Sequence, residues 1–155
     1  MKKKLGVVGW WEGQNEGDLY IRHCLGEAFK EFDISWISTP FPADEPNLAK
    51  LNRLDFLIIG GGGLFTDTPP TPFTGYQEWS EKLKTPFGFL GVGVQEINSK
   101  YKSVIKTLVE EARFFAVRDK GSFGLVSPFA VSKVRKIPDP AFLIPRRVER
   151  SPLKG

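Results

Sequence analysis

Short apolar runs alternate with amphipathic stretches along most of the chain, and this alternation is typical of a parallel α/β sheet. Six runs have the length and composition of strands. They lie at residues 5–8, 34–37, 56–59, 86–92, 114–117 and 134–137. The third of these runs is apolar at every position, as expected of a strand that is covered on both faces.

Apolar residues at helical spacing separate these strands. The stretch 18–32 is apolar at positions 21, 24, 25, 28, 29 and 32, which predicts one face of an amphipathic helix. Further helical patterns lie at 48–54, at 76–83, in a segment with Ser99 as N-cap and apolar positions up to 112, and directly after residue 117. The sequence therefore predicts an α/β fold, a Rossmann-like parallel sheet flanked by helices.

Length and composition narrow the class of protein. A chain of 155 residues can bury the core of one ordinary domain but not of two. Its 41% hydrophobic and 26% charged residues are typical of a globular rather than a disordered protein. No apolar run approaches the ~20 residues that a membrane span needs. The single cysteine, Cys24, excludes an internal disulfide, and with the only histidine, His23, it cannot build a metal site, so we expect a cytoplasmic protein without a metal.

The net charge of +4 comes from the C-terminal end. Residues 131–155 carry seven basic side chains against two acidic ones. A basic end can bind nucleic acid, but no aromatic residue lies among the basic ones of 146–155, and we expect no nucleic-acid partner. Residues 1–145 are predicted to form the domain, and 146–155 a basic tail or a linker to an absent second lobe.

Glycine-rich segments follow several of the predicted strands. They read GWWEGQNEGD after the first strand, GGGGLFTD after the third and GVGVQ within and after the fourth, while RDKGS follows the fifth. Carboxyl ends of parallel strands share one edge of a sheet, and ligands bind there near the point where the strand order reverses. The four glycines at 60–63 therefore have two explanations: a tight turn of the chain, or the close approach of a ligand to backbone N–H groups.

The usual nucleotide-binding motifs are absent from these segments. The first places its glycines at 9, 13 and 17, which is not the G-x-G-x-x-G spacing, and the second predicted strand ends in ISTP without an acidic residue for a ribose. No G-x-x-x-x-G-K-[ST] motif occurs, which excludes a P-loop. A nicotinamide-dependent dehydrogenase is therefore a poor interpretation.

Five segments together resemble the signatures of the polysaccharide pyruvyl transferase family. GWWEGQNEGD resembles the opening motif of that family, with Gly9 at its head and Asn15, Gly17 and Asp18 in the matching places. DFLIIGGGGLFTD resembles its aspartate, apolar strand, triple glycine and later aspartate. GVGVQEI, AVRDKGS and IPDPAFLI resemble its later signatures in the same order, so the resemblance covers residues 9–144.

This resemblance implies an enzyme that takes the pyruvyl group from phosphoenolpyruvate and attaches it as a ketal to a pair of sugar hydroxyls in a cell-surface polysaccharide. It also implies a two-lobed architecture of glycosyltransferase-B type, in which this chain is the first lobe, on the acceptor side. Phosphoenolpyruvate is then the donor substrate, and no cofactor is implied. The lobe expected to hold it has no counterpart here, so we expect no turnover by this chain alone. The expected partners are a sugar or polysaccharide precursor and either a second lobe or further copies of the chain.

Two other functions remain open at this stage. A sugar-nucleotide-dependent glycosyltransferase lobe would share the sheet and would depend on a nucleotide rather than on phosphoenolpyruvate. A non-catalytic module that binds a sugar or an anion would have the same loops and no chemistry.

Asp18 is the candidate catalytic residue, a general base toward a sugar hydroxyl, and its alternative role is to cap the first helix and complement its dipole. Arg118 could hold a phosphate or a carboxylate with its planar guanidinium, or form an internal ion pair. Trp10 and Trp11 lie where tryptophan could stack on a sugar, with one of them expected in the core. The remaining candidate substrate-binding residues are Asn15, Gly17, Gly61, Gly62, Gly63, Asp67, Gly93 and Gln95. For Asn15 the alternative is a hydrogen bond within its own loop, and for Asp67 it is support of the proline-rich loop.

Overall fold

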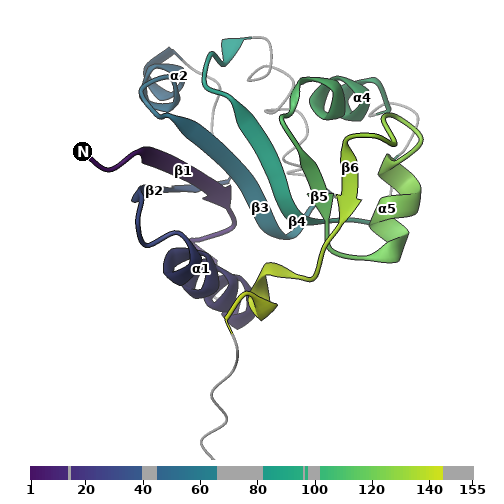
Figure 1. Ribbon diagram of the computed structural model, residues 1–155, viewed down its shortest axis with the longest axis horizontal. Coiled ribbons are helices and arrows are strands. Elements are labelled where there is room, and N and C mark those ends of the chain that lie inside the picture. The colour runs from purple at the N-terminus through teal and green to yellow at the C-terminus, as the bar shows by residue number, and fades with distance from the viewer. Residues whose placement is uncertain (14, 40–44, 66–81, 96, 98–101, 145–155) are drawn as a thin grey trace, which may run out of the picture.

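The computed structural model describes residues 1–13, 15–39, 45–65, 82–95, 97 and 102–144. In this part of the chain six strands form one parallel sheet in the order β2-β1-β3-β4-β5-β6 (Figure 1). The strands are β1 (Lys4–Gly9), β2 (Asp33–Ser38), β3 (Phe56–Phe65), β4 (Phe87–Val94), β5 (Phe115–Val117) and β6 (Val134–Lys136). The predicted α/β class is confirmed, and the order is that of the flavodoxin-like variant of doubly wound sheets.

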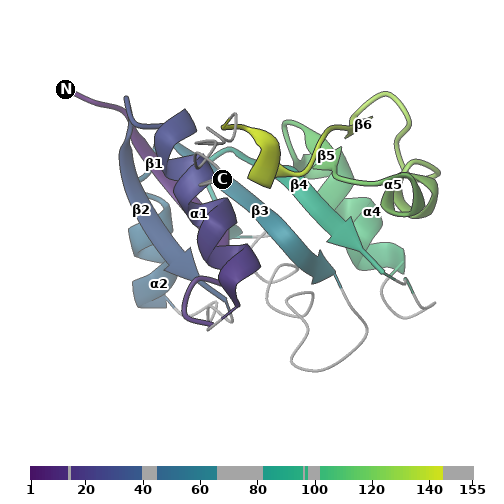
Figure 2. The same cartoon turned by 90° about the horizontal axis from the view of Figure 1, so that it is seen from below.

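Helices cover both faces of the sheet. They are α1 (Glu16–Ala28), α2 (Glu45–Leu51), α4 (Lys102–Glu111), α5 (Lys120–Val126) and the 3₁₀-helix η2 (Pro140–Phe142). Figure 2 shows α1 and η2 in front of the sheet, with α2 and α4 on the opposite side. Among the described helices, none combines the length and apolar character that crossing a membrane requires.

The first helix ends earlier than its apolar spacing predicts. The spacing extends to residue 32, whereas α1 ends at Ala28. The N–H of Phe29 makes a last helical bond to Leu25 O (2.9 Å), and the N–H of Phe32 then donates to Phe29 O in a turn that leads to β2. The other predicted helices near 48–54 and after residue 117 are confirmed as α2 and α5. The apolar positions from 104 lie on α4, while Ser99 and residues 76–81 lie outside the described residues.

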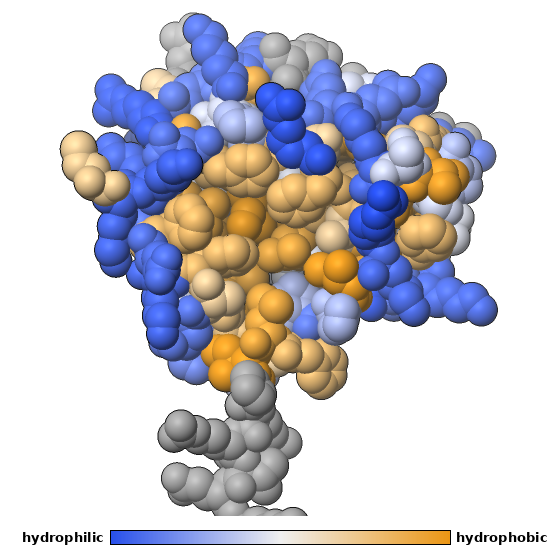
Figure 3. Space-filling model, viewed as in Figure 1, coloured by the Kyte–Doolittle hydropathy of each residue, from blue (hydrophilic) through white to orange (hydrophobic). Residues whose placement is uncertain are grey.

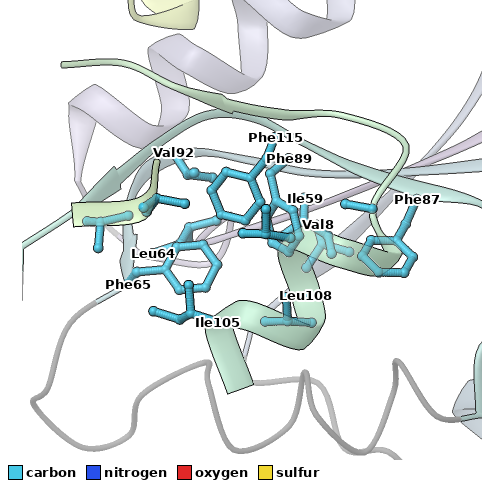
Figure 4. Packing of buried hydrophobic residues seen from close by; sticks show 14 of the residues in the cluster. Val8, Ile59, Leu64, Phe65, Phe87, Phe89, Val92, Ile105, Leu108 and Phe115 are labelled. Atoms are coloured by element: carbon cyan, nitrogen blue, oxygen red, sulfur yellow. The ribbon is translucent and has the colours of Figure 1, made fainter. Parts of the chain in front are cut away.

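Two apolar clusters of described residues hold the layers together. The smaller cluster lies between α1 and the sheet and contains Leu5, Val7, Trp11, Ile21, Leu25 and Ile58. The larger cluster lies on the opposite face, where α2, α4 and α5 contribute side chains. At its centre Phe89 and Phe115 are stacked with ring centroids 4.4 Å apart, and Phe65 lies 5.4 Å from Phe89 (Figure 4). Full burial of each such ring stabilises the fold by roughly 1.5–3 kcal/mol.

The third strand is much longer than predicted, and it contains the four glycines that the sequence places in a loop. β3 runs to Phe65 and remains paired with β4, with a register shift between Gly62 and Phe65. Gly61 and Gly62 have φ angles of +82° and +88°, which side chains rarely adopt. A Cβ on Gly60 would lie 2.1 Å from the carbonyl oxygen of Leu90 in β4. The glycines therefore form an irregular strand end rather than a loop.

Apolar side chains also reach the surface. Figure 3 shows them gathered in the middle of the face seen in Figure 1, with polar side chains around them. At the end of η2, which contacts α1, the side chains of Phe142 and Leu143 are 76% and 49% exposed. Hydrophobic residues therefore form part of the molecular surface beside α1.

Candidate functional site

The strand order reverses between β1 and β3, and ligands of doubly wound sheets bind beyond the carboxyl ends of the strands at such a point. From β1 the chain proceeds outward to β2, and it then returns to the other side of β1 as β3. The segment after Gly9 leads into α1, and Gly62 lies near the end of the parallel strand β3. The structure therefore confirms the expectation that the segments after β1 and β3 lie on one edge of the sheet.

Asp18 and Gly62 are in direct contact at this edge. Asp18 lies in the first turn of α1 and is half-buried. A Cβ on Gly62 would lie 2.8 Å from Asp18 Oδ1, so the carboxylate occupies the space that a side chain at position 62 would need. Gly62 thus serves two purposes: it adopts the positive φ and it admits the carboxylate of Asp18.

Burial raises the pKa of the Asp18 carboxyl above its ordinary value of 3.8. The positive charge of Arg118 lowers this pKa, and the negative charge of Asp139 raises it. The net upward shift makes Asp18 a stronger base than a carboxylate in water. Three segments that are far apart in the sequence therefore set the basicity of one carboxylate.

Arg118 follows β5 and forms an internal ion pair. Its Nη1 donates a hydrogen bond to Asp139 Oδ2 (2.9 Å), and both side chains are partly buried. The other carboxylate oxygen of Asp139 accepts from the N–H of Ala141 (2.9 Å) and so caps η2. A Cβ on Gly93 would lie 2.9 Å from Arg118 Nε, so this glycine makes room for the guanidinium against β4. The predicted internal ion pair of Arg118 is confirmed.

Asp119, the neighbour of Arg118, has a different role. It is the N-cap of α5 and accepts hydrogen bonds from the N–H (2.7 Å) and the hydroxyl (2.8 Å) of Ser122. The bond from the Ser122 N–H is the main cause that holds the pKa of Asp119 below 3.8. Ser122 in turn accepts from the N–H of Val94 (2.8 Å), which joins α5 to the end of β4.

Gly63 differs from the other three glycines of β3 because, among the described residues, no atom would clash with a Cβ at this position. It is exposed, its φ is ordinary, and a Cβ there would have Arg118 Nη2 and Gln95 Nε2 as its nearest described neighbours, each 3.9 Å away. By contrast, Gly61 is buried beneath Ile21, whose Cγ2 would lie 2.4 Å from an added Cβ. Of the predicted glycine contacts, Gly63 is therefore the position where a ligand could approach the backbone between two polar side chains.

Asn15 and Gly17 form the exposed start of α1. Asn15 is the N-cap, and its side-chain oxygen accepts from the N–H of Gly17 (2.9 Å). The predicted bond of Asn15 within its own loop is confirmed. The suggested capping role of Asp18 is wrong, because Asn15 provides the cap, although Asp18 does lie in the first turn, where a negative charge complements the helix dipole. Asp67 lies outside the described residues.

The two tryptophans after β1 separate as predicted. Trp11 is 4% exposed, its indole N–H donates to Val7 O (2.9 Å), and its ring meets Trp36 edge-on at 5.4 Å. Trp10 is 41% exposed on the same segment. Trp11 is therefore the core residue, and Trp10 is the one whose ring can meet a ligand.

The sequence reasoning missed Asp139 as a site residue. The segment IPDPAFLI was recognised as a signature, but an aspartate before a proline is equally typical of a turn. Its position directly after the sixth predicted strand was the available signal. His23 is exposed and Cys24 is buried, and within the described ranges no group of His, Cys, Asp and Glu could hold a metal ion.

Taken together, the edge of the sheet carries a carboxylate with a raised pKa, a guanidinium held by an ion pair, and exposed backbone at Gly63. A carboxylate of this kind can take a proton from a hydroxyl group. A guanidinium can bind an anionic group. The arrangement fits a ligand, or a pair of ligands, with both hydroxyl and anionic groups.

Comparisons with known proteins bear on this site. A family model described as polysaccharide pyruvyl transferase matches residues 15–154 of the chain. No curated protein matches the chain. Among solved structures, a flavodoxin of Streptococcus pneumoniae TIGR4 is similar with a TM-score of 0.46 and 12% sequence identity, over 83% of this chain and 95% of that chain. The structural likeness is too low to support a functional argument, whereas the family match spans most of the chain.

Proposed function

The chain belongs to the polysaccharide pyruvyl transferase family, and from this premise we propose that it holds the sugar acceptor while a pyruvyl group is transferred from phosphoenolpyruvate. In this proposal residues 1–145 form the acceptor-side lobe, and residues 146–155 lead to the part that binds the donor. The product is a ketal on a sugar of a cell-surface polysaccharide.

The observation that carries the proposal is the position of Asp18. Its carboxylate lies against Gly62 where the strand order reverses, and burial raises its pKa. Ketal formation breaks two sugar O–H bonds and makes two C–O bonds at the enol carbon of phosphoenolpyruvate, whose bond to the phosphate oxygen breaks. One proton ends on the methylene carbon, which becomes a methyl group, and the other leaves with the phosphate. Asp18 takes up a hydroxyl proton as the oxygen attacks.

Arg118 and Gln95 support the same proposal at the neighbouring strands. Both side chains reach toward Gly63, where the backbone is exposed. The guanidinium of Arg118 can bind the carboxylate of the pyruvyl group or the departing phosphate. Asp139 holds the guanidinium in place through the ion pair. Hydroxyl activation and anion binding would then lie on the same edge of the sheet.

Phosphate release from phosphoenolpyruvate tests the proposal. With a panel of oligosaccharide acceptors, the purified chain alone should release no phosphate, because the donor-binding lobe is expected elsewhere. In a two-lobed protein that carries this chain as its first lobe, Asp18→Asn should lower kcat by roughly 10²–10⁴, the usual contribution of a general base.

Glu16→Gln is the matched control for this experiment. Glu16 is an exposed acidic residue in the same first turn of α1, and its loss should leave kcat nearly unchanged. Equal losses for both variants would point to the helix dipole rather than to proton transfer. Turnover that depends on a sugar nucleotide instead of phosphoenolpyruvate would overturn the proposal.

A further inference from the structure

A pocket of about 630 Å³ lies between the edge strand β2 and helix α2, apart from the Asp18 site. Figure 2 shows β2 as the outermost strand at one side of the sheet, with α2 beside it. The volume is within the range of roughly 300–1,000 Å³ that small-molecule sites occupy. Glu12, from the segment between β1 and α1, lines the pocket at its end near the carboxyl edge.

One side chain in the pocket wall has an unsatisfied polar atom. Thr39 is 7% exposed, and its Oγ1 is buried without a hydrogen-bond partner in the described part of the chain. Among the described residues, the other two buried polar ones are satisfied: the Thr85 hydroxyl donates to Leu51 O (2.8 Å), and Ser122 bonds with Asp119. Most buried hydroxyls in proteins have a partner, so the exception at Thr39 calls for an explanation. A rotation of about 120° about χ1 moves the hydroxyl of a threonine to another staggered position, which would let this hydroxyl meet a ligand in the pocket.

The lining of the pocket indicates the class of ligand. One wall carries the hydroxyl of Ser35 on β2, and another carries the apolar side chains of Leu51 and Leu54 on α2 or just after it. Among the described residues that line the pocket, the two charged groups, Glu12 and Lys50, have opposite signs. A neutral sugar has hydroxyl groups around its rim and apolar C–H faces, and it matches both walls without requiring a net charge.

We propose that this β2–α2 pocket binds a neutral sugar unit of the acceptor chain, next to the unit that reacts at Asp18. The inference rests on the acceptor-binding part of the proposed function. Strands β2 and β3 flank β1, and since neighbouring strands lie about 4.8 Å apart, the axes of β2 and β3 are separated by only about 10 Å. An oligosaccharide can therefore extend along the carboxyl edge from β3 past the β1–α1 segment to β2.

The experiment is a titration of the ¹⁵N-labelled 155-residue chain with neutral trisaccharides (maltotriose, cellotriose and mannotriose), followed by amide chemical shifts. At least one of them should shift the amides of Ser35, Ser38 and Lys50. Thr39→Val should lower the affinity for that sugar by roughly tenfold, as expected for the loss of one buried hydrogen bond, without lowering Tm. Thr107→Val on α4 is the control and should bind as the unchanged chain does.

Two further variants test whether the sugar binds in the pocket and whether the Thr39 hydroxyl stabilises the fold. Ser35→Phe places a large side chain at an exposed position of the pocket and should abolish binding while the fold is retained. Thr85→Val removes a hydroxyl that is hydrogen-bonded and should lower Tm, in contrast to Thr39→Val. Sugar shifts confined to other surfaces, equal affinity of the Thr39→Val chain, or shifts in this pocket by an extended peptide but by no sugar would each overturn the inference.

Failure of the proposed function gives a different result. Binding of a trisaccharide in the β2–α2 pocket without any pyruvyl transfer in the two-lobed protein would refute the transfer reaction and leave the sugar site standing. Transfer with an acceptor KM that Thr39→Val does not change would refute the sugar site and leave the reaction standing.

Discussion

At the scale of single residues, Gly62 and Gly63 have opposite reasons to be glycine. Gly62 has a φ of +88° and lies directly beneath the carboxylate of Asp18, whereas Gly63 has an ordinary φ and is exposed. A side chain at position 62 would be strained and would also displace Asp18. In the described part of the chain, the atoms nearest to a methyl group at position 63 would be 3.9 Å away.

Alanine substitutions should therefore separate the two positions. Gly62→Ala should lower the free energy of unfolding by roughly 1–3 kcal/mol, the cost of a residue held in a sparsely populated backbone region. Gly63→Ala should change it by less than about 0.5 kcal/mol, as at an ordinary surface position, and should weaken binding of the acceptor sugar. Urea unfolding and sugar titration of both variants measure the two effects. Equal losses of stability would show that Gly63 is as structural as Gly62.

The sequence predicted that these glycines matter, but it could not divide their roles. Four consecutive glycines do not indicate by their sequence which one faces Ile21, which faces Asp18 and which faces solvent. These differences arise from the packing of α1 on β3, which is a tertiary feature. Asp18 was recognised because it ends the segment GWWEGQNEGD, whose resemblance to the opening motif of the family is a local pattern that the sequence does display.

At the scale of elements, the six strands were predicted closely and the end of β3 was not. Its apolar core at 56–59 has the pattern of a buried strand, whereas GGGG is typical of a turn. The glycines remain in the strand because β4 runs beside them and pairs with Gly60 and Gly62. Pairing between residues about 30 positions apart in the sequence is set by sheet order, which local composition does not reveal.

The short helix α5 depends on its N-cap. Asp119→Ala should lower the free energy of unfolding at neutral pH by roughly 1 kcal/mol, a typical cost of losing a capping side chain. Because the pKa of Asp119 is lowered in the folded protein, its stabilising charge is present above the ordinary value of 3.8 and is lost as the pH falls through the folded pKa. The difference between the unchanged chain and the variant should therefore shrink in acid.

Urea unfolding at a series of pH values from neutral to about 2 measures this change. Asp119→Asn is the matched variant: it keeps an oxygen that can accept from Ser122 and should lose less stability than the alanine variant. If the loss of unfolding free energy in Asp119→Ala stays constant across the pH series, the charge of Asp119 does not contribute to the cap.

At the scale of the whole molecule, the edge of the sheet connects three distant parts of the chain. Asp18 comes from α1, Arg118 from the end of β5, and Asp139 from the turn between β6 and η2. η2 also packs against α1, so the last described segment returns to the first helix. The charge near Asp18 is therefore a property of the folded chain, which explains why Asp139 was missed when the sequence was considered segment by segment.

This arrangement predicts that Asp139 controls the basicity of Asp18 from a distance. Asp139→Asn removes a negative charge that raises the pKa of Asp18, and it leaves the positive charge of Arg118 without its closest counter-charge. Both effects act in the same direction, so the pKa of Asp18 should fall. An asparagine can still accept from the N–H of Ala141, so the cap of η2 should persist. The pH titration of the Asp18 side-chain carboxyl carbon by ¹³C NMR measures the shift.

Asp33→Asn is the control for this titration, because Asp33 begins β2 at the opposite edge of the sheet, and its charge should not affect Asp18. A lower pKa leaves more Asp18 ionised but makes each carboxylate a weaker base. In a two-lobed protein, Asp139→Asn should therefore lower the maximal rate and move the acid limb of its pH profile to lower pH. An unchanged or raised pKa of Asp18 in this variant would contradict the prediction that the charge of Asp139 raises this pKa.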